Sequence, residues 1–423
     1  MNRVLILCDE FPPRSGPRMG YLVKYLSRLG WESCVITGEV PARASFEALT
    51  GFAKEVHVIP QKRHRKWNLL HVLPLFWPYD YLRGEHDMLA KARAVAANRK
   101  FDVILSSCTF EMFPNNSAHA VAREFDLPLV VDIRDMPAQN PRKPFSGMSM
   151  VEKLVFLRSK LGFLGARRSM SVLRAADALV SISPWHVRWL KEHCNENSFL
   201  IYNGYDPETF FPVESRPTDC FRIVYTGTLA SESSRDYTFL LESVQALHER
   251  GVIDPRTFQV VFYSGEVETG NPIRERIASR GIGDFFSFRD FVPSSEVPSI
   301  LGDASVLLVL ASRNGFHGVM TTKFFEYLAV NRPILCVASD EGVLEEAMRE
   351  AECGCAARSA GEAERFIERL YREWQEKGFT VGTTRADKIG CYSRKFQAEQ
   401  FADIFRRAIE NRGSGAASRR PHT

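Results

Sequence analysis

The chain has 423 residues, of which 45% are hydrophobic, and its 55 Lys and Arg against 51 Asp and Glu give a net charge of +4. This length exceeds one ordinary domain core and predicts at least two domains. The composition is that of a globular protein, and the small net charge gives no support to a nucleic-acid partner.

The cysteines and the apolar segments exclude further classes. Nine cysteines without a regular spacing, and an amino terminus without a signal-like segment, predict a protein of the reducing cytoplasm. The close pair Cys353 and Cys355 fits no common zinc spacing, so we expect no metal site. No stretch reaches the roughly 20 apolar residues that a membrane-spanning helix needs.

Short β-rich segments alternate with helical patterns along the chain. In the first half, expected strands are 4–8, 34–37, 56–59, 103–106, 129–133, 178–182 and 199–202, and a helix over 21–29 ends at Gly30. A second series has strands at 221–226, 259–263, 305–310 and 334–337. The alternation predicts an α/β fold of two Rossmann-like, doubly wound parallel-sheet domains.

Domain boundaries follow from changes in this pattern. We expect an amino-terminal domain at 1–210, a proline-rich linker at 211–220 and a second domain at 221–388. A carboxyl-terminal helix at 389–411 is expected to return to the first domain, and 412–423 to be disordered. Parallel sheets bind ligands beyond the carboxyl ends of their strands, so a cleft between the two domains is the predicted site.

The loops after the first-domain strands contain candidate polar residues. Gly16, followed by Arg18, precedes a helix whose first N–H groups could bind a phosphate, although a plain proline-rich turn fits as well. Asp132, Arg134 and Asp135 end the strand at 129–133. They fit the floor of a polar cleft, as an acid or a binder of acceptor hydroxyls, or else a structural salt-bridge cluster.

The second domain repeats this arrangement. Gly227, followed by Arg235, comes after its first strand. In TTKFFEYLAVNRPILCV (321–337), Thr321 or Thr322 could cap a helix whose first turn contains Lys323. A cation beside free N–H groups predicts a diphosphate site.

Glu326, three residues after Lys323, could accept two hydrogen bonds from a ribose diol. The alternative is that these two side chains form a plain surface ion pair on the helix.

Taken together, these motifs resemble the retaining nucleotide-sugar glycosyltransferases of family four, which have the two-domain GT-B fold. The likeness covers nearly the whole chain and is carried by FPPRSGPRMGYLVKYLSRLGWE, VVDIRDMP, ADALVSISP, IYNGYDPETF, VYTGTL and TTKFFEYLAVNRPIL. The family subset that ends in TKxFEYLA resembles the chain best and is common among enzymes of surface-polysaccharide biosynthesis.

The resemblance implies roles for particular residues. It places Glu326 on the ribose hydroxyls and the base near Phe291 and Val292. The remaining assignments are Lys323, Arg235 and Asp135 as catalytic; Gly16, Gly227, Thr322 and Lys323 as donor-binding; and Arg18, Arg134 and Gly318 on the acceptor and sugar side.

Two positions depart from the family pattern. Many members have a glutamate at the position of Gly318, eight residues before the ribose-binding glutamate. Many also have a histidine at the end of the strand where this chain has Arg134 and Asp135.

The resemblance therefore implies a retaining, metal-independent glycosyltransferase without a cofactor. It would move a hexosyl or N-acetylhexosaminyl group from a nucleotide-sugar donor, a UDP-sugar in the first instance, to a glycan or lipid-linked acceptor. A nucleotide-sugar epimerase of the same fold and a non-catalytic nucleotide-sugar-binding subunit are the alternatives.

The segment 148–170 interleaves leucines with lysines and arginines. Such a basic amphipathic pattern predicts peripheral contact with the inner face of the cytoplasmic membrane, while a packed helix with a solvated basic face is the alternative.

Overall fold

The fold is given by a computed structural model, which describes residues 1–13, 15–39, 46–60, 77–109, 112–136, 170–229, 235–265, 272–293, 295–311 and 317–418. The chain divides into two compact units, one formed by Met1–Tyr202 with Arg394–Thr423 and the other by Asn203–Ser393. No helix of the described residues is long and apolar enough to cross a membrane.

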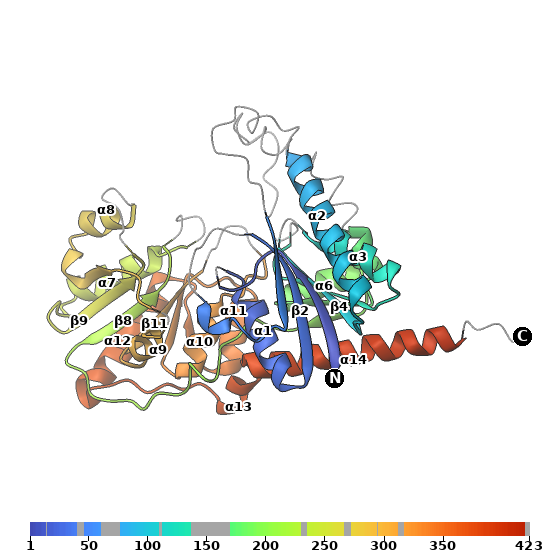
Figure 1. The fold of residues 1–423 in the computed structure, drawn as a ribbon. Coiled ribbons are helices and arrows are strands. Elements are labelled where there is room, and N and C mark those ends of the chain that lie inside the picture. The colour runs from blue at the N-terminus through green and yellow to red at the C-terminus, as the bar shows by residue number, and fades with distance from the viewer. Residues whose placement is uncertain are drawn as a thin grey trace, which may run out of the picture. The chain divides into compact units, whose positions relative to one another are not determined.

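Within the described residues, the first unit is built on a seven-stranded parallel sheet in the order β3-β2-β1-β4-β5-β6-β7 (Figure 1). Its strands are β1 (Asn2–Cys8), β2 (Trp31–Gly38), β3 (Glu55–Ile59), β4 (Val103–Cys108), β5 (Leu129–Ile133), β6 (Ala178–Ser181) and β7 (Ser198–Leu200). Most residues of the central strands β1, β4 and β5 are apolar and nearly all are buried, as expected for a parallel sheet covered on both faces.

Helices cover both faces of this sheet. One core lies under α2 (Trp77–Asn98), α3 (Asn115–Glu124) and α6 (Pro184–His193), with Met88, Val121 and Leu190 among its buried side chains. The other lies under α1 (Pro17–Arg28) and α14 (Arg394–Ser418), where Phe405 meets the Trp31 ring edge-on at 5.3 Å. The carboxyl-terminal helix therefore packs on the first unit. A 3-10 helix, η1 (Glu47–Leu49), lies between β2 and β3.

The second unit has a six-stranded parallel sheet among its described residues, in the order β10-β9-β8-β11-β12-β13. Its strands are β8 (Phe221–Thr226), β9 (Phe258–Tyr263), β10 (Phe286–Arg289), β11 (Val306–Leu310), β12 (Ile334–Val337) and β13 (Gly354–Ala356). The helices are α7 (Thr238–Glu249), α8 (Pro272–Ser279), α9 (Val297–Gly302), α10 (Thr322–Val330), α11 (Val343–Ala351), α12 (Ala360–Lys377) and α13 (Ala386–Ile389), with 3-10 helices η5 (Gly283–Phe285) and η6 (Gly390–Tyr392).

Two boundaries differ from the sequence-based expectation. The segment 211–220 belongs to the second unit, because the Val213 N–H donates to Val330 O at 3.2 Å and the Thr218 N–H to Gly378 O at 2.9 Å. The division between the units lies instead at Tyr202. Helix α14 continues to Ser418, so the segment 412–418, predicted to be disordered, is helical.

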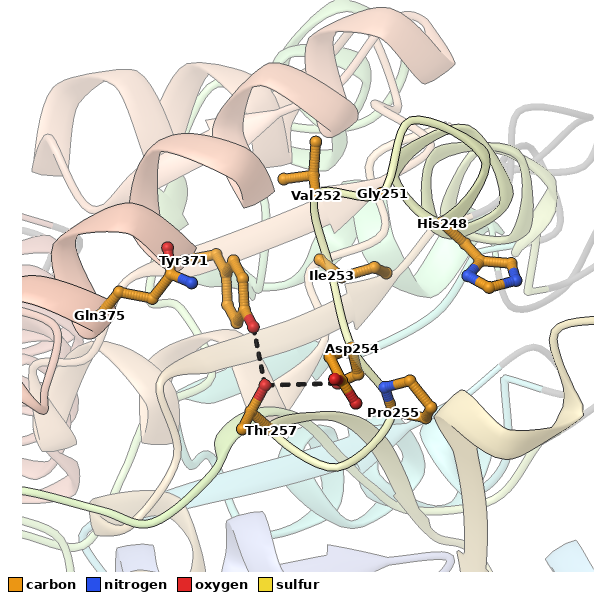
Figure 2. Close-up of a pocket in the computed structure, with 9 residues that line it drawn as sticks. All are labelled: His248, Gly251, Val252, Ile253, Asp254, Pro255, Thr257, Tyr371 and Gln375. Atoms are coloured by element: carbon orange, nitrogen blue, oxygen red, sulfur yellow. Dashed lines mark hydrogen bonds between the residues drawn. The ribbon is translucent and has the colours of Figure 1, made fainter.

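A pocket of the second unit lies beside the amino end of β9 (Figure 2), where the Thr257 and Tyr371 hydroxyls are 2.8 Å apart. Asp254, in the same pocket, forms an ion pair with Arg256 at 2.5 Å. Since the strands of this sheet are parallel, the pocket is at the end of the sheet opposite to the loops that contain the predicted site residues. It shares no residue with that predicted site.

Candidate active site

Gly227 and Lys323 are in contact at the carboxyl end of β8. Gly227 has φ 129°, and a Cβ atom there would lie 2.3 Å from Lys323 Cε and 2.5 Å from Nζ. The lysine stem therefore lies against the glycine backbone, with its ammonium 5.7 Å from the centre of the Tyr225 ring. Only a residue without a side chain leaves room for this arrangement.

The charges around Lys323 come from the predicted donor-site residues. Burial lowers the pKa of Lys323, the negative charge of Glu326 opposes this shift, and the positive charge of Arg235 adds to it. Arg235 also hydrogen-bonds the Tyr225 hydroxyl, which donates to Thr228 O at 3.0 Å. The structure thus gathers Gly227, Lys323, Arg235 and Glu326 around one point. A desolvated cation beside a second cation favours an anionic ligand.

Helix α10 begins at this point. Thr321 occupies the N-cap position with an extended backbone, but its side chain makes no capping hydrogen bond. The predicted N-cap position is therefore confirmed, while the predicted side-chain cap is not formed. Thr322, the first helical residue, is half-buried. The Phe324 N–H donates to Thr321 O at 3.2 Å. A helix start without a side-chain cap from its own N-cap residue suits the binding of an anion.

The buried face of α10 is formed by apolar side chains. Phe324, Phe325, Leu328 and Ala329 are fully buried, and the helix ends at Asn331 with φ 57°. Lys323 and Glu326 lie outside this apolar face and are half-buried. The packing of α10 thereby fixes the position of both side chains.

An exposed aromatic ring lies two strands away from β8 at the same edge of the sheet. The Phe291 side chain, which follows β10, is 60% exposed. It lies over Gly265, which follows β9 with φ 77°, since a Cβ atom there would be 2.6 Å from Phe291 Cε2. Val292 beside it is half-buried. An exposed ring on a bare backbone offers a stacking surface for a base.

Two further residues of this edge bear on the sequence predictions. Gly318 has φ 72° and is buried. Glycine adopts this left-handed conformation more readily than any residue with a side chain. Ser264, which the sequence analysis did not single out, has a buried hydroxyl without a hydrogen-bond partner among the described residues.

In the first unit, the loop after β1 depends on Gly16. This residue has φ 69° and forms the N-cap of α1, and a Cβ atom there would lie 2.4 Å from Glu10 O. The Ser15 hydroxyl donates to Glu10 Oε2 at 2.7 Å. The close approach requires glycine, so the loop is more constrained than an ordinary proline-rich turn.

Arg18 and Asp132 form a buried pair. The Arg18 Nε and Nη2 atoms donate to Asp132 Oδ2 and Oδ1 at 3.1 and 2.9 Å, and Nη1 donates to Tyr202 O at 2.8 Å. Asp132 also accepts from the Ser107 hydroxyl at 3.0 Å. Arg18 is only 4% exposed. This geometry favours the structural salt-bridge alternative for Asp132. Arg18, which the resemblance assigned to the acceptor and sugar side, has its guanidinium engaged in the same buried pair.

Arg134 pairs with Asp9 at the ends of β5 and β1. Asp9 also accepts from the Thr109 hydroxyl at 3.0 Å. Burial raises the pKa of Asp9 to about 6, with Arg134 opposing this shift and Glu10 adding to it. Burial likewise raises the pKa of the half-buried Asp135, and again Arg134 opposes the shift.

Asp9 and Thr109 were not predicted as site residues, although each is a polar residue directly after a strand. His186 was also missed. Its Nδ1 is 2.9 Å from the Ser181 hydroxyl, which donates to Ile133 O at 2.6 Å. Its Nε2 is buried without a partner among the described residues. Burial lowers the pKa of His186 to about 4, so the imidazole is neutral at pH 7.

The fold and these two strand-end clusters define a protein of the GT-B class, as comparison with solved structures shows. The sucrose-phosphate synthase of Thermosynechococcus elongatus is similar at TM-score 0.63 and 14% identity, over 97% of this chain and 100% of that chain. A glycosyltransferase from Rickettsia africae ESF-5 matches at 0.63 and 12%, over 97% and 99% of the two chains. HepE of Anabaena, solved with UDP and glucose, matches at 0.60 and 12%, over 95% and 99%.

At the level of sequence families, residues 15–198 match the glycosyl transferase 4-like domain. The resemblance to family-four GT-B glycosyltransferases is therefore confirmed. No curated protein matches the chain by sequence.

Proposed function

We propose that the protein is a retaining glycosyltransferase that moves a sugar from a nucleotide-sugar donor, a UDP-sugar in the first instance, to an acceptor hydroxyl. The observation that carries this proposal is the contact of the desolvated Lys323 with Gly227, beside Arg235 and the start of α10. Two cations, a bare backbone and uncapped N–H groups form a cradle for a diphosphate.

The other donor-site residues agree with a nucleoside diphosphate in one orientation. The diphosphate lies on Gly227, Lys323 and Thr322, the ribose hydroxyls donate to Glu326, and the base stacks on Phe291. The complex of HepE with UDP and glucose, in a protein of the same fold, supports UDP as the first nucleotide to test.

The chemistry that we assign to this site is stabilisation of the leaving group. As the bond from sugar to diphosphate breaks, negative charge develops on the phosphate oxygens beside Lys323 and Arg235. Removing one such donor typically slows catalysis about 10²- to 10³-fold. A phosphate oxygen takes the proton of the incoming hydroxyl, so the step requires neither a metal nor a cofactor.

We assign the acceptor to the strand ends of the first unit. Asp135, half-buried next to Arg134, has a raised pKa and is the candidate to bind or polarise the incoming hydroxyl. Gly16 shapes the loop beside it. The acceptor that we propose is a glycan or a lipid-linked sugar of surface-polysaccharide biosynthesis, which would place the enzyme at the cytoplasmic face of the membrane.

The proposed membrane contact rests on the basic segment 148–170, of which all but Met170 lies outside the described residues. Flotation of the whole protein with anionic vesicles at low salt tests this contact, and protein that stays in the aqueous fraction would contradict it.

The experiment that tests the activity is incubation of the purified protein with UDP-glucose, UDP-N-acetylglucosamine and their GDP analogues, with and without acceptor sugars. A transferase releases the nucleoside diphosphate, slowly to water and faster with an acceptor, and leaves the anomeric configuration unchanged in the product. An epimerase would alter the donor sugar without an acceptor. If the donor binds but is never consumed, the protein is a binding subunit.

A further inference from the structure

A cluster of three metal-binding side chains lies on the outer strands of the first sheet. Strands β2 and β3 are parallel, with Cys34 opposite Glu55 and Ile36 opposite His57. Since alternate residues of a strand point to the same face, Glu55 and His57 flank Cys34 on one face. The Cys34 Sγ, the His57 nitrogen and the Glu55 oxygen all lie within 4.8 Å of one another.

The hydrogen bonds around this cluster leave one Glu55 oxygen facing the His57 ring. Glu55 Oε2 is 3.3 Å from His57 Nε2, yet His57 Nε2 is a buried nitrogen without a hydrogen-bond partner among the described residues. The other carboxylate oxygen, Oε1, accepts from Arg99 Nη2 at 2.7 Å. Arg99 therefore holds the carboxylate by one oxygen and leaves the second facing the imidazole, as groups behind a metal ligand commonly do.

We propose that Cys34, Glu55 and His57 bind a divalent transition-metal ion of the zinc type. Thiolate, imidazole and carboxylate are the donors that Zn²⁺ uses, and three protein ligands leave a fourth position for water. Ligand atoms around a tetrahedral zinc lie about 3.5 Å apart, so small side-chain rotations close the site. On binding, Cys34 exchanges its thiol proton for a bond to the metal, and that proton leaves to solvent.

The position of the cluster in the sheet determines what a bound metal would do to the fold. In the described part of the sheet, β3 is the outermost strand and pairs with one strand, β2. Val56 and Val58 of this strand are 43% and 59% exposed. A metal shared between β2 and β3 would hold this outer strand in register. Sequence spacing did not reveal the site, because its ligands are separated by a loop and meet only through strand pairing.

Titration of the whole protein with Co²⁺, a spectroscopic substitute for Zn²⁺, tests the proposal. We expect a thiolate-to-metal charge-transfer band that saturates at one equivalent and is abolished by Zn²⁺. Cys34→Ser and His57→Asn should weaken Co²⁺ binding at least tenfold. Cys391→Ser, which removes an exposed thiol, is the matched control and should retain the band.

Absence of a band up to millimolar Co²⁺ would overturn the proposal, as would a band that persists in Cys34→Ser or disappears in Cys391→Ser. If the buried Cys34→Ser variant misfolds, the proposal is tested with the more exposed His57→Asn variant, whose thermal unfolding is measured with and without Zn²⁺. Zn²⁺ should raise the midpoint of the wild type and leave that of His57→Asn unchanged. Equal shifts in the two proteins would contradict the site.

Discussion

Replacing Lys323 by Met removes the charge that is central to the proposed donor site while leaving a stem to cover Gly227. A cation about 4 Å from a phosphate contributes on the order of 4 kcal/mol near a protein surface, before the penalty for removing it from water. Burial already lowers the pKa of Lys323 in the protein without ligand. The fold therefore already bears much of this penalty.

We accordingly expect Lys323→Met to lose about 2.7–4 kcal/mol of transition-state stabilisation, which is a decrease in kcat of about 10²- to 10³-fold. Stability should be unchanged or higher, because a desolvated ammonium is removed. The assay is the initial rate of nucleotide release at saturating donor, together with urea unfolding to show that the variant is folded. A folded variant that loses less than tenfold in rate would refute the assignment.

Four other substitutions test the surrounding groups. Gly227→Ala puts a Cβ atom within 2.5 Å of two Lys323 atoms. We expect it to weaken nucleotide binding, measured by calorimetry, at least tenfold, and an unchanged affinity would contradict the proposed contact. Glu326→Ala should weaken UDP by about 1.5–3 kcal/mol but leave dideoxy-UDP unaffected, whereas equal losses would contradict the ribose contact. Phe291→Ala, at a side chain that is 60% exposed, should cost about 1–3 kcal/mol of UDP binding through lost stacking without a change in the unfolding midpoint. Burial raises the pKa of Asp9 to about 6, so the folded protein binds this proton more tightly than the unfolded chain does. The free energy of unfolding of the wild type should therefore decrease by roughly 2–3 kcal/mol as the pH rises from about 4 to 6. Urea unfolding of Asp9→Asn should show a smaller decrease over the same pH range.

The architecture and the residues of the proposed donor site could be picked out from the sequence because they rest on local patterns. The strands at 129–133, 221–226 and 334–337 have the predicted bounds, since each is a short segment rich in β-branched and other apolar residues. Lys323 and Glu326 stand out because four apolar neighbours define the buried face of α10. The two strands that were not predicted, β10 and β13, lie at the edges of the second sheet, and neither contains a β-branched residue.

The first-unit cluster was less predictable, because its members meet only through the fold. Asp132 pairs with Arg18, 114 residues away, and Arg134 with Asp9, 125 residues away. From the sequence these charges could be a polar floor or a salt-bridge network. Only the sheet order, which places β1 beside β4 and β4 beside β5, decides which charges are neighbours.

We propose that the loops after β8, β9, β10 and β11 bind a nucleoside diphosphate. The most direct test is the thermal unfolding of wild type, Lys323→Met and Glu326→Ala with UDP, GDP and ADP. A nucleotide at 100 times its dissociation constant adds about 2.7 kcal/mol of stability. We expect that one nucleotide stabilises the wild type by this amount and both variants much less. No stabilisation of the wild type by any of the three, or equal stabilisation of all three proteins, would contradict it.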